Sequence, residues 1–317
     1  MRLCLITLNT KRNMKTIEST TEHYLLWLQV ERRFAASSIV KYRSILKCFI
    51  RDVGNIKIKD FRMEHIFKLK QILYQRNNSE VFIGVTLSCL KGFLKYLRDY
   101  QKIRLKINPD EITIPKRPRK EVVFLTKEEI KRFKRSISAK TVCGLRFRTL
   151  VEVLLASGMR ISEALNLNQN SIDYETMEAK VIGKGNKERA VFFTKESLNW
   201  VRRYLERREE LKDNNEALFT TTFKWGKNGK REETRRLRNQ DLTRYFKRQR
   251  IKAGINKKVT PHILRHCFAS HLAFNNCPFT EIKTLCGHER LDTTIRYYVG
   301  LTDKQKAKEA HRMYLKY

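Results

Sequence analysis

The sequence predicts a mainly α-helical protein with a small antiparallel β-sheet, divided into two domains. Apolar residues recur at the spacing of amphipathic helices along residues 18–104. Residues 105–120 interrupt this pattern and hold three of the five prolines in the chain. Beyond them, two strand-like runs flank a turn that contains glycine. A chain of 317 residues is long enough for two domains of ordinary size, and its apolar content excludes a disordered chain.

The N-terminal part is expected to hold an extension, residues 1–17, followed by four helices. The apolar run in the extension is shorter than the roughly 7–15 residues that a signal peptide needs. Ser19 and Glu22 have capping-box spacing at the start of the first helix, and Ser38 is a candidate cap for the second. Apolar residues on one face mark the third and fourth helices: Ile66, Leu69, Ile72 and Leu73, then Val85, Leu90, Phe93, Leu94 and Leu97.

Residues 105–120 are interpreted as the linker between the domains. Pro109, Pro115 and Pro118 stiffen this segment and oppose regular structure. Taken alone, such a segment is most often a solvated loop. Its last residues form a basic cluster that we expect to lie along a phosphate backbone: Lys116, Arg117, Arg119 and Lys120.

The C-terminal part, residues 121–317, is expected to combine helices with a hairpin. Thr126 and Glu129 have capping-box spacing before a helical stretch. Ala179–Gly183 and Glu188–Phe193 have the composition of two strands. Residues 224–250 are intensely basic, and we expect them to be part loop and part helix on an anionic partner. The basic residues of this part that we expect to touch that partner are Lys187, Arg189, Arg235, Arg236 and Arg244.

The charge of the chain restricts what it binds. Lys and Arg total 68 against 33 Asp and Glu, a net charge of +35 that repels itself unless an anionic partner offsets it. Nucleic acid is favoured over a membrane because the charge is spread along the chain, and no stretch approaches the roughly 20 apolar residues of a membrane span. The seven cysteines form no Cys-x-x-Cys pair, which predicts reduced thiols and a cytoplasmic location.

Two local patterns place cations where they could meet a phosphate. Arg160 follows a glycine at a predicted helix start, and Glu163 lies on the same helical face. Lys184 lies at the predicted hairpin tip between two glycines. Each pattern taken alone is more often a surface ion pair or a solvated turn.

Two further patterns add titratable groups. His262 and Arg265 share one face of a helix that begins with proline, and this pairing suits phosphoryl transfer. His288 follows a glycine and precedes Tyr297 by nine residues. A buried aromatic side chain would explain Tyr297 alone, but it does not explain four such patterns in this order.

A zinc site is the alternative for the same region. His262 and His266 have the i, i+4 spacing of a helical zinc site, but Ile263 stands where a zinc protease needs glutamate. Neighbouring thiols and imidazole keep the alternative open: Cys267, His271 and Cys277. We expect no metal and no other cofactor.

The ordered series resembles the tyrosine site-specific recombinases of the phage-integrase family, most closely the Xer-type enzymes and the integrases of mobile elements. The resemblance covers nearly the whole chain and implies a helical core-binding domain at 18–104, the linker at 105–120 and a mixed α/β catalytic domain at 121–317. The catalytic motifs are specific, whereas the N-terminal match is one of size and helicity only. The residues that carry the resemblance are those of the catalytic motifs: Arg160, Lys184, His262, Arg265, His288 and Tyr297.

The chain departs from the family pattern at three positions near these motifs. The family usually has Leu at Met159, Thr or Ser at Cys267, and Leu or Met at Cys286. All three are expected to be packing substitutions. The spacing from His288 selects Tyr297 over its neighbour Tyr298 as the nucleophile.

The resemblance implies a role for each matched residue. Arg160 and Arg265 would bind the non-bridging phosphate oxygens, His288 would hydrogen-bond the phosphate, and Glu163 would support the site. Tyr297 would attack phosphorus to form a 3′-phosphotyrosine, with His262 as its base. Lys184 would protonate the departing 5′ oxygen. The two guanidinium groups could do what metal ions do elsewhere, so no metal is required. Religation conserves bond energy, so no ATP is needed.

The implied partners are double-stranded DNA with specific recombination sites and further copies of the chain. We expect a tetramer on two sites, with the tail helix at 302–317 packed either on a neighbouring subunit or on its own domain. The sequence leaves accessory proteins open. Two other functions remain: a type IB topoisomerase-like enzyme that relaxes DNA, and a non-catalytic DNA-binding protein, which the intact set of catalytic residues opposes.

Overall fold

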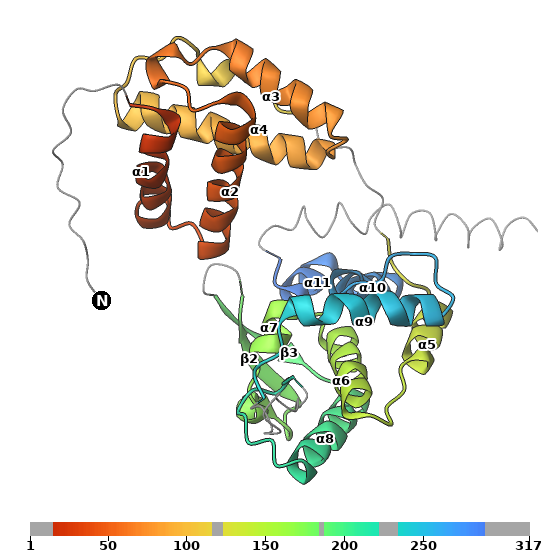
Figure 1. Cartoon of the computed structure of the whole chain (residues 1–317). Helices are drawn as coiled ribbons and strands as arrows, with labels where there is room; N and C mark the ends of the chain where they lie inside the picture. Colours follow the sequence, from red (N-terminus) through yellow and green to blue (C-terminus); the bar gives the residue numbers. More distant parts are fainter. Residues whose placement is uncertain (1–14, 116–122, 184–186, 222–233, 289–317) are drawn as a thin grey trace, which may run out of the picture. The chain divides into compact units, whose positions relative to one another are not determined.

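The computed structural model describes residues 15–115, 123–183, 187–221 and 234–288 (Figure 1). The chain divides into two compact units, Met1–Arg119 and Lys120–Tyr317. Among the described residues, every helix falls short of the length and apolar character that a membrane span requires.

The N-terminal unit is helical. Its long helices are α1 (Ile17–Val30), α2 (Ala36–Val53), α3 (Met63–Gln75) and α4 (Glu80–Lys95). Short turns of helix accompany them: η1 (Ile58–Asp60), η2 (Tyr96–Tyr100) and η3 (Pro109–Glu111).

The starts of α1 and α2 differ from the prediction. Thr16 caps α1, and its side chain and that of Ser19 satisfy each other's backbone N–H, so the helix begins before the predicted Ser19–Glu22 box. Helix α2 begins after Ala35, with no side-chain cap, instead of at Ser38. Both predicted caps are therefore wrong.

The first part of the predicted linker packs on the N-terminal unit. Ile107 and Ile112 are buried in the core of this unit, and the Lys91 ammonium donates to the carbonyl of Asp110 across 3.1 Å. Apolar side chains spaced between the prolines give this stretch a surface to bury, which proline content alone does not reveal. The basic cluster at 116–120 lies outside the described residues.

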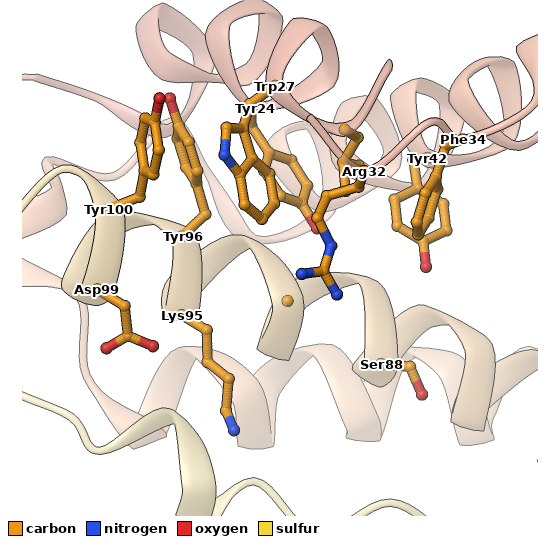
Figure 2. Close-up of a pocket in the computed structure, with 12 residues that line it drawn as sticks. Tyr24, Trp27, Arg32, Phe34, Tyr42, Ser88, Lys95, Tyr96, Asp99 and Tyr100 are labelled. Atoms are coloured by element: carbon orange, nitrogen blue, oxygen red, sulfur yellow. The ribbon is translucent and has the colours of Figure 1, made fainter. Parts of the chain in front are cut away.

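An aromatic cavity of about 450 Å³ opens on the N-terminal unit (Figure 2). Along one side, the rings of Trp27 and Tyr96 lie 5.1 Å apart and those of Tyr96 and Tyr100 lie 5.5 Å apart, centroid to centroid. The guanidinium of Arg32 lies 5.7 Å from the Trp27 ring. These ring contacts join α1 to η2, the turn that follows α4.

The C-terminal unit surrounds a small sheet with helices. Strands β1 (Ile172–Asp173), β2 (Glu178–Ile182) and β3 (Glu188–Phe192) pair antiparallel in that order, with Ala179 opposite Val191. The helices are α5 (Lys127–Ser136), α6 (Val142–Ser157), α7 (Ile161–Asn166), α8 (Lys195–Glu210), α9 (Asn239–Lys252), α10 (Pro261–Phe274) and α11 (Phe279–Cys286), with a turn η4 (Gln169–Ser171).

Several predictions for this unit are confirmed. The fold is mainly α with a small antiparallel sheet, and the two strands match the predicted ranges within one residue. Thr126 and Glu129 form the expected capping box, with backbone-to-side-chain distances of 3.1 and 2.8 Å. The hairpin tip, residues 184–186, lies outside the described residues.

Helix α6 is the buried centre of the C-terminal unit. It packs against both α8 and α10 (Figure 1), and its Leu150, Val151 and Leu154 are fully buried. The helix ends at Gly158, so the chain that leaves this rigid element leads directly into Arg160.

Candidate active site

Arg160 is positioned by two consecutive helix ends. Gly158 closes α6 with φ +62°, and a Cβ there would overlap the ring of Phe268, so only glycine fits. Arg160 is then the N-cap residue of α7. Its backbone N–H donates to Glu163 Oε2 at 2.7 Å, and its Nη1 donates to Oε1 at 2.8 Å. Glu163 thus caps the helix and orients the arginine at once.

Arg265 and His262 come from α10. Pro261 occupies the first turn of this helix, and Thr260 caps it by accepting from the N–H of Ile263. The Arg265 side chain is buried and donates to the carbonyl of Gly158 at 2.8 Å. Burial, then the positive charge of Arg265, lowers the pKa of His262.

His288 follows the end of α11. Gly287 closes the helix with φ +61°, and the N–H groups of Gly287 and His288 bond back to Thr284 and Lys283 at 3.0 and 2.9 Å, as in a Schellman motif. Burial, then the charges of Arg265 and Arg160, lowers the pKa of His288 to about 4. This histidine therefore lies in the electrostatic field of both arginines.

Three successive carbonyls at the end of α11 accept hydrogen bonds from three different arginines, and we call them the carbonyl turn. Leu285 accepts from Nη1 of Arg189 at 3.0 Å, Cys286 from Nη2 of Arg265, and Gly287 from Nη2 of Arg160 at 2.9 Å. Carbonyls in the last turn of a helix lack helical partners and carry partial negative charge. The carbonyl turn therefore gathers three guanidinium groups at one point.

Glu163 joins two of these arginines. Its carboxylate is almost fully buried and accepts from Arg160 through Oε1 and from Arg189 through Oε2, both at 2.8 Å. A Cβ on Gly183, at the base of the hairpin, would lie 3.7 Å from Glu163 Oε1 and 3.9 Å from Arg160 Nη1. The chain therefore approaches this group of residues immediately before Lys184.

The structure brings together six of the residues that the sequence singled out, with Arg189 among them. Lys184 and Tyr297 lie outside the described residues. We call the assembled side chains the cationic cluster: Arg160, Glu163, Arg189, His262, Arg265 and His288.

Comparison with known proteins identifies the kind of protein that carries this cluster. A model of the phage integrase family matches residues 123–305. The chain belongs to this family. It is a tyrosine site-specific recombinase, an enzyme that cleaves and rejoins DNA, and the prediction of family and function is confirmed. The comparisons give no support to the topoisomerase-like or the non-catalytic alternative.

Curated relatives match this recombinase over nearly its whole length. It is 30% identical to tyrosine recombinase XerC of Leptospira interrogans over 306 residues, which cover 94% of this chain and 93% of the relative. It is 28% identical to tyrosine recombinase XerC of Proteus mirabilis over 287 residues, which cover 89% and 90% of the two chains.

Solved structures share the fold of the recombinase. The XerH site-specific recombinase bound to palindromic difH substrate has a TM-score of 0.70 at 22% identity, with 93% of this chain and 84% of that chain covered. A lambda integrase tetramer bound to a Holliday junction has a TM-score of 0.69 at 17% identity, with 90% and 78% covered.

Two of the arginines that were expected to touch DNA point inward in the recombinase. The side chain of Arg189 is 13% exposed and contacts Glu163 and Leu285. Arg236 donates to the carbonyls of Leu165 and Leu167, each at 2.9 Å. Both guanidinium groups donate hydrogen bonds to main-chain carbonyls. The sequence does not show which carbonyls need such a donor.

The other expected DNA contacts are more accessible. Lys187 and Arg244 are exposed, and Arg235 forms an exposed ion pair with Asp241 at 2.9 Å. The inward position of Arg189 had a signal in the sequence. Strand side chains alternate between faces, so Arg189 shares the buried face of β3 with Val191.

The histidines of α10 pack on each other. The rings of His262 and His266 meet edge to face with centroids 4.3 Å apart. Within the part of the chain that the structure describes, no group of three or more His, Cys, Asp or Glu side chains is arranged to hold a metal ion.

Proposed function

We propose that this recombinase exchanges DNA strands through a 3′-phosphotyrosine formed by Tyr297, in the integration, excision or resolution of DNA. The observation that carries the proposal is the convergence of Arg160, Arg265 and His288 at the carbonyl turn. The nucleophile that we assign follows nine residues after His288 in the sequence.

Arg160 and Arg265 are the proposed phosphate ligands. A guanidinium has five N–H donors, and the contacts above use two on each side chain, which leaves others for the non-bridging oxygens. These donors would stabilise the added charge of the pentavalent transition state. Losing one such donor typically costs about 10²–10³ in rate. The guanidinium pair takes the role that metal ions have in many other phosphoryl-transfer enzymes, so the proposed reaction uses neither metal nor ATP.

His262 and Lys184 are the proposed proton carriers. A phenol has a pKa of about 10 and must lose its proton as it attacks. His262 is suited to accept that proton because its lowered pKa keeps it neutral at pH 7. The bond from Tyr297 to phosphorus forms as the bond to the 5′ oxygen breaks, and Lys184 protonates that oxygen. A neutral His288 retains an N–H that can donate to the phosphate.

The proposed substrate is double-stranded DNA with specific recombination sites. The XerH relative is solved on difH DNA, and lambda integrase as a tetramer on a Holliday junction. By likeness we infer a tetramer, with the N-terminal unit, Met1–Arg119, as core-binding domain and the C-terminal unit, Lys120–Tyr317, as catalytic domain. Such an enzyme would act in the cytoplasm, where the DNA is.

Replacement of the tyrosine tests the proposed nucleophile. Tyr297→Phe removes the attacking oxygen but no DNA contact of the cationic cluster, so it is expected to bind DNA and form no covalent adduct. The measurement is adduct formation on a suicide substrate, a DNA whose cleaved strand diffuses away. Tyr298→Phe is the matched control and is expected to keep the adduct. An adduct with Tyr297→Phe would overturn the assignment.

A substrate comparison separates recombination from relaxation. A plasmid with two recombination sites is expected to yield recombinant products, whereas a supercoiled plasmid with no site should remain supercoiled. Relaxation of the plasmid without a site, and no exchange on the other, would favour the topoisomerase-like function.

A further inference from the structure

We propose that Arg189 is a positioning residue of the active site, which holds Glu163, and through it Arg160, in place for the phosphate. It also ties strand β3 to the end of α11. The inference rests on the proposed function, because it assumes that Arg160 binds the reacting phosphate.

The side chain of Arg189 points inward and contacts two parts of the chain that are distant in sequence. Its Nη2 donates to Glu163 Oε2 at 2.8 Å, and its Nη1 donates to the carbonyl of Leu285 at 3.0 Å. The side chain is 13% exposed, and that of Glu163 is 3% exposed. An arginine buried in this way contacts other residues of the protein and not DNA bound at the surface.

Gly287 makes room for the Arg189 side chain. A Cβ on this glycine would lie 2.5 Å from Nε and 2.7 Å from Cδ of Arg189. Gly287 also has φ +61°, a conformation that disfavours other residues. The guanidinium of Arg189 therefore occupies space that depends on the shape of the carbonyl turn.

The charges explain why Glu163 needs both arginines. A buried carboxylate that loses one of its ion-pair partners still carries the cost of leaving water. It loses part of the electrostatic attraction that offsets this cost. Without Arg189, Glu163 Oε2 would retain only the backbone N–H of Arg160 among the contacts that the structure describes. The carboxylate is then expected to turn toward solvent, and Arg160 with it.

The position of Arg189 in β3 extends this effect to the hairpin. The N–H of Gly183 bonds to the carbonyl of Lys187 at 2.8 Å, and these two residues flank Lys184 in the sequence. One side chain thus connects the base of that hairpin to the segment that carries His288. From β3, Arg189 contacts two elements beside which proposed catalytic residues lie, α7 next to Arg160 and α11 next to His288.

The test uses full-length Arg189→Met and Arg189→Lys. Methionine removes the charge, whereas lysine keeps it but cannot reproduce the planar, two-pronged contact. Both are expected to bind DNA as the unaltered protein does, with an unchanged salt dependence. Their adduct formation on a suicide substrate is expected to be roughly 10- to 100-fold slower, the usual cost of a small displacement near a reacting group.

Arg148→Met is the matched control for the loss of a largely buried arginine. Arg148 likewise bonds one carboxylate, Glu152 at 2.8 Å, and one carbonyl, Lys134 at 2.7 Å, with its side chain 15% exposed. It lies on α6 and contacts no member of the cationic cluster in the described residues. It is expected to lower stability and to leave the adduct rate unchanged.

A neutral substrate distinguishes positioning from a general loss of structure. In a methylphosphonate, a methyl group replaces one non-bridging oxygen of the reacting phosphate and removes its charge. If Arg189 acts by placing Arg160 against that charge, the loss of adduct rate in both variants, relative to the unaltered protein, should be several-fold smaller on this DNA. A general structural defect would slow both substrates equally.

The outcomes separate the inference from the function on which it rests. If the unaltered protein forms no adduct on the ordinary substrate, the proposed function fails. If it does, three results would overturn the role of Arg189: an unchanged rate in both variants, an equal deficit on both substrates, or a reduced salt dependence that reveals direct DNA contact. Should Arg189→Met not fold, Arg189→Lys carries the same comparison.

Discussion

The histidines in the cationic cluster and beside it have lowered pKa values and stay neutral at pH 7. The pKa of His288 is lowered to about 4 by burial and then by Arg265 and Arg160. The pKa of His266 is also lowered to about 4, by burial and then by His262 and Arg265. A neutral imidazole can accept or donate a proton, so the arginines that would bind phosphate also prepare their neighbours for chemistry.

These shifts predict that the free energy of unfolding falls as pH falls from 6.5 towards 4. A histidine with a lowered pKa binds fewer protons in the folded state, so its contribution is complete above the unfolded value of 6.5 and declines below it. Denaturant unfolding across this range measures the effect. His266→Gln removes one of these groups and should flatten the dependence; an equally steep profile would contradict the shift.

Much of the candidate site was readable from single residues. Arg160, His262, Arg265 and His288 were predicted from residue type and order, and the structure gathers them. The role of Arg189 was not predicted, because a basic residue in so basic a chain was expected to touch DNA instead of a buried carboxylate. Its partner Leu285 lies 96 residues away, and local spacing carries no information about such a contact.

Helix ends determine where the side chains of the site begin. The turns after α6 and α11 both need glycine in a left-handed conformation, and each leads into a proposed catalytic residue one or two positions later. Among the predicted starts, the box at Thr126 was correct because its residues satisfy each other locally. The box at Ser19 failed because tertiary pairing fixes the chain there: Lys15 and Ile17 bond to Ile58 and Ile56 on a neighbouring segment. Ser38 lies inside the first turn of α2, where its N–H already bonds to the carbonyl of Ala35.

Gly144 provides a prediction for the start of α6. A Cβ there would overlap the carbonyl of Ser138, a backbone atom that cannot swing aside. Gly144→Ala gains about 1 kcal/mol of helix propensity but forces the loop away from α6, so a net loss of about 1–3 kcal/mol is expected. Denaturant unfolding measures it.

Gly84→Ala in α4 is the control for that change. The nearest atom to its Cβ would be 3.5 Å away, an ordinary contact. It is expected to be neutral or stabilising. If the two alanine variants proved equally stable, the crowding at Gly144 would not be real.

At the scale of the whole molecule, net charge pointed correctly to DNA, but it could not say which cations face it. The charge of +35 predicts that the logarithm of DNA affinity falls linearly with the logarithm of salt concentration, by about 0.9 per neutralised phosphate. Arg244 is exposed on α9, whereas Arg236 bonds main-chain carbonyls. We expect Arg244→Ala to lower the slope by about 0.9 and Arg236→Ala to leave it unchanged. Binding isotherms at several salt concentrations measure both slopes, and equal slopes would refute the distinction.

The carbonyl turn determines which amino acids residues 285–287 can accept. Its acceptors are main-chain oxygens, which every amino acid supplies, so the arginines recognise the path of the backbone and not the identity of residues 285 and 286. A cysteine at 286 fills the small cluster beneath it without altering what Arg265 binds. Only position 287, where the backbone must turn left-handed beside a guanidinium, is closed to substitution.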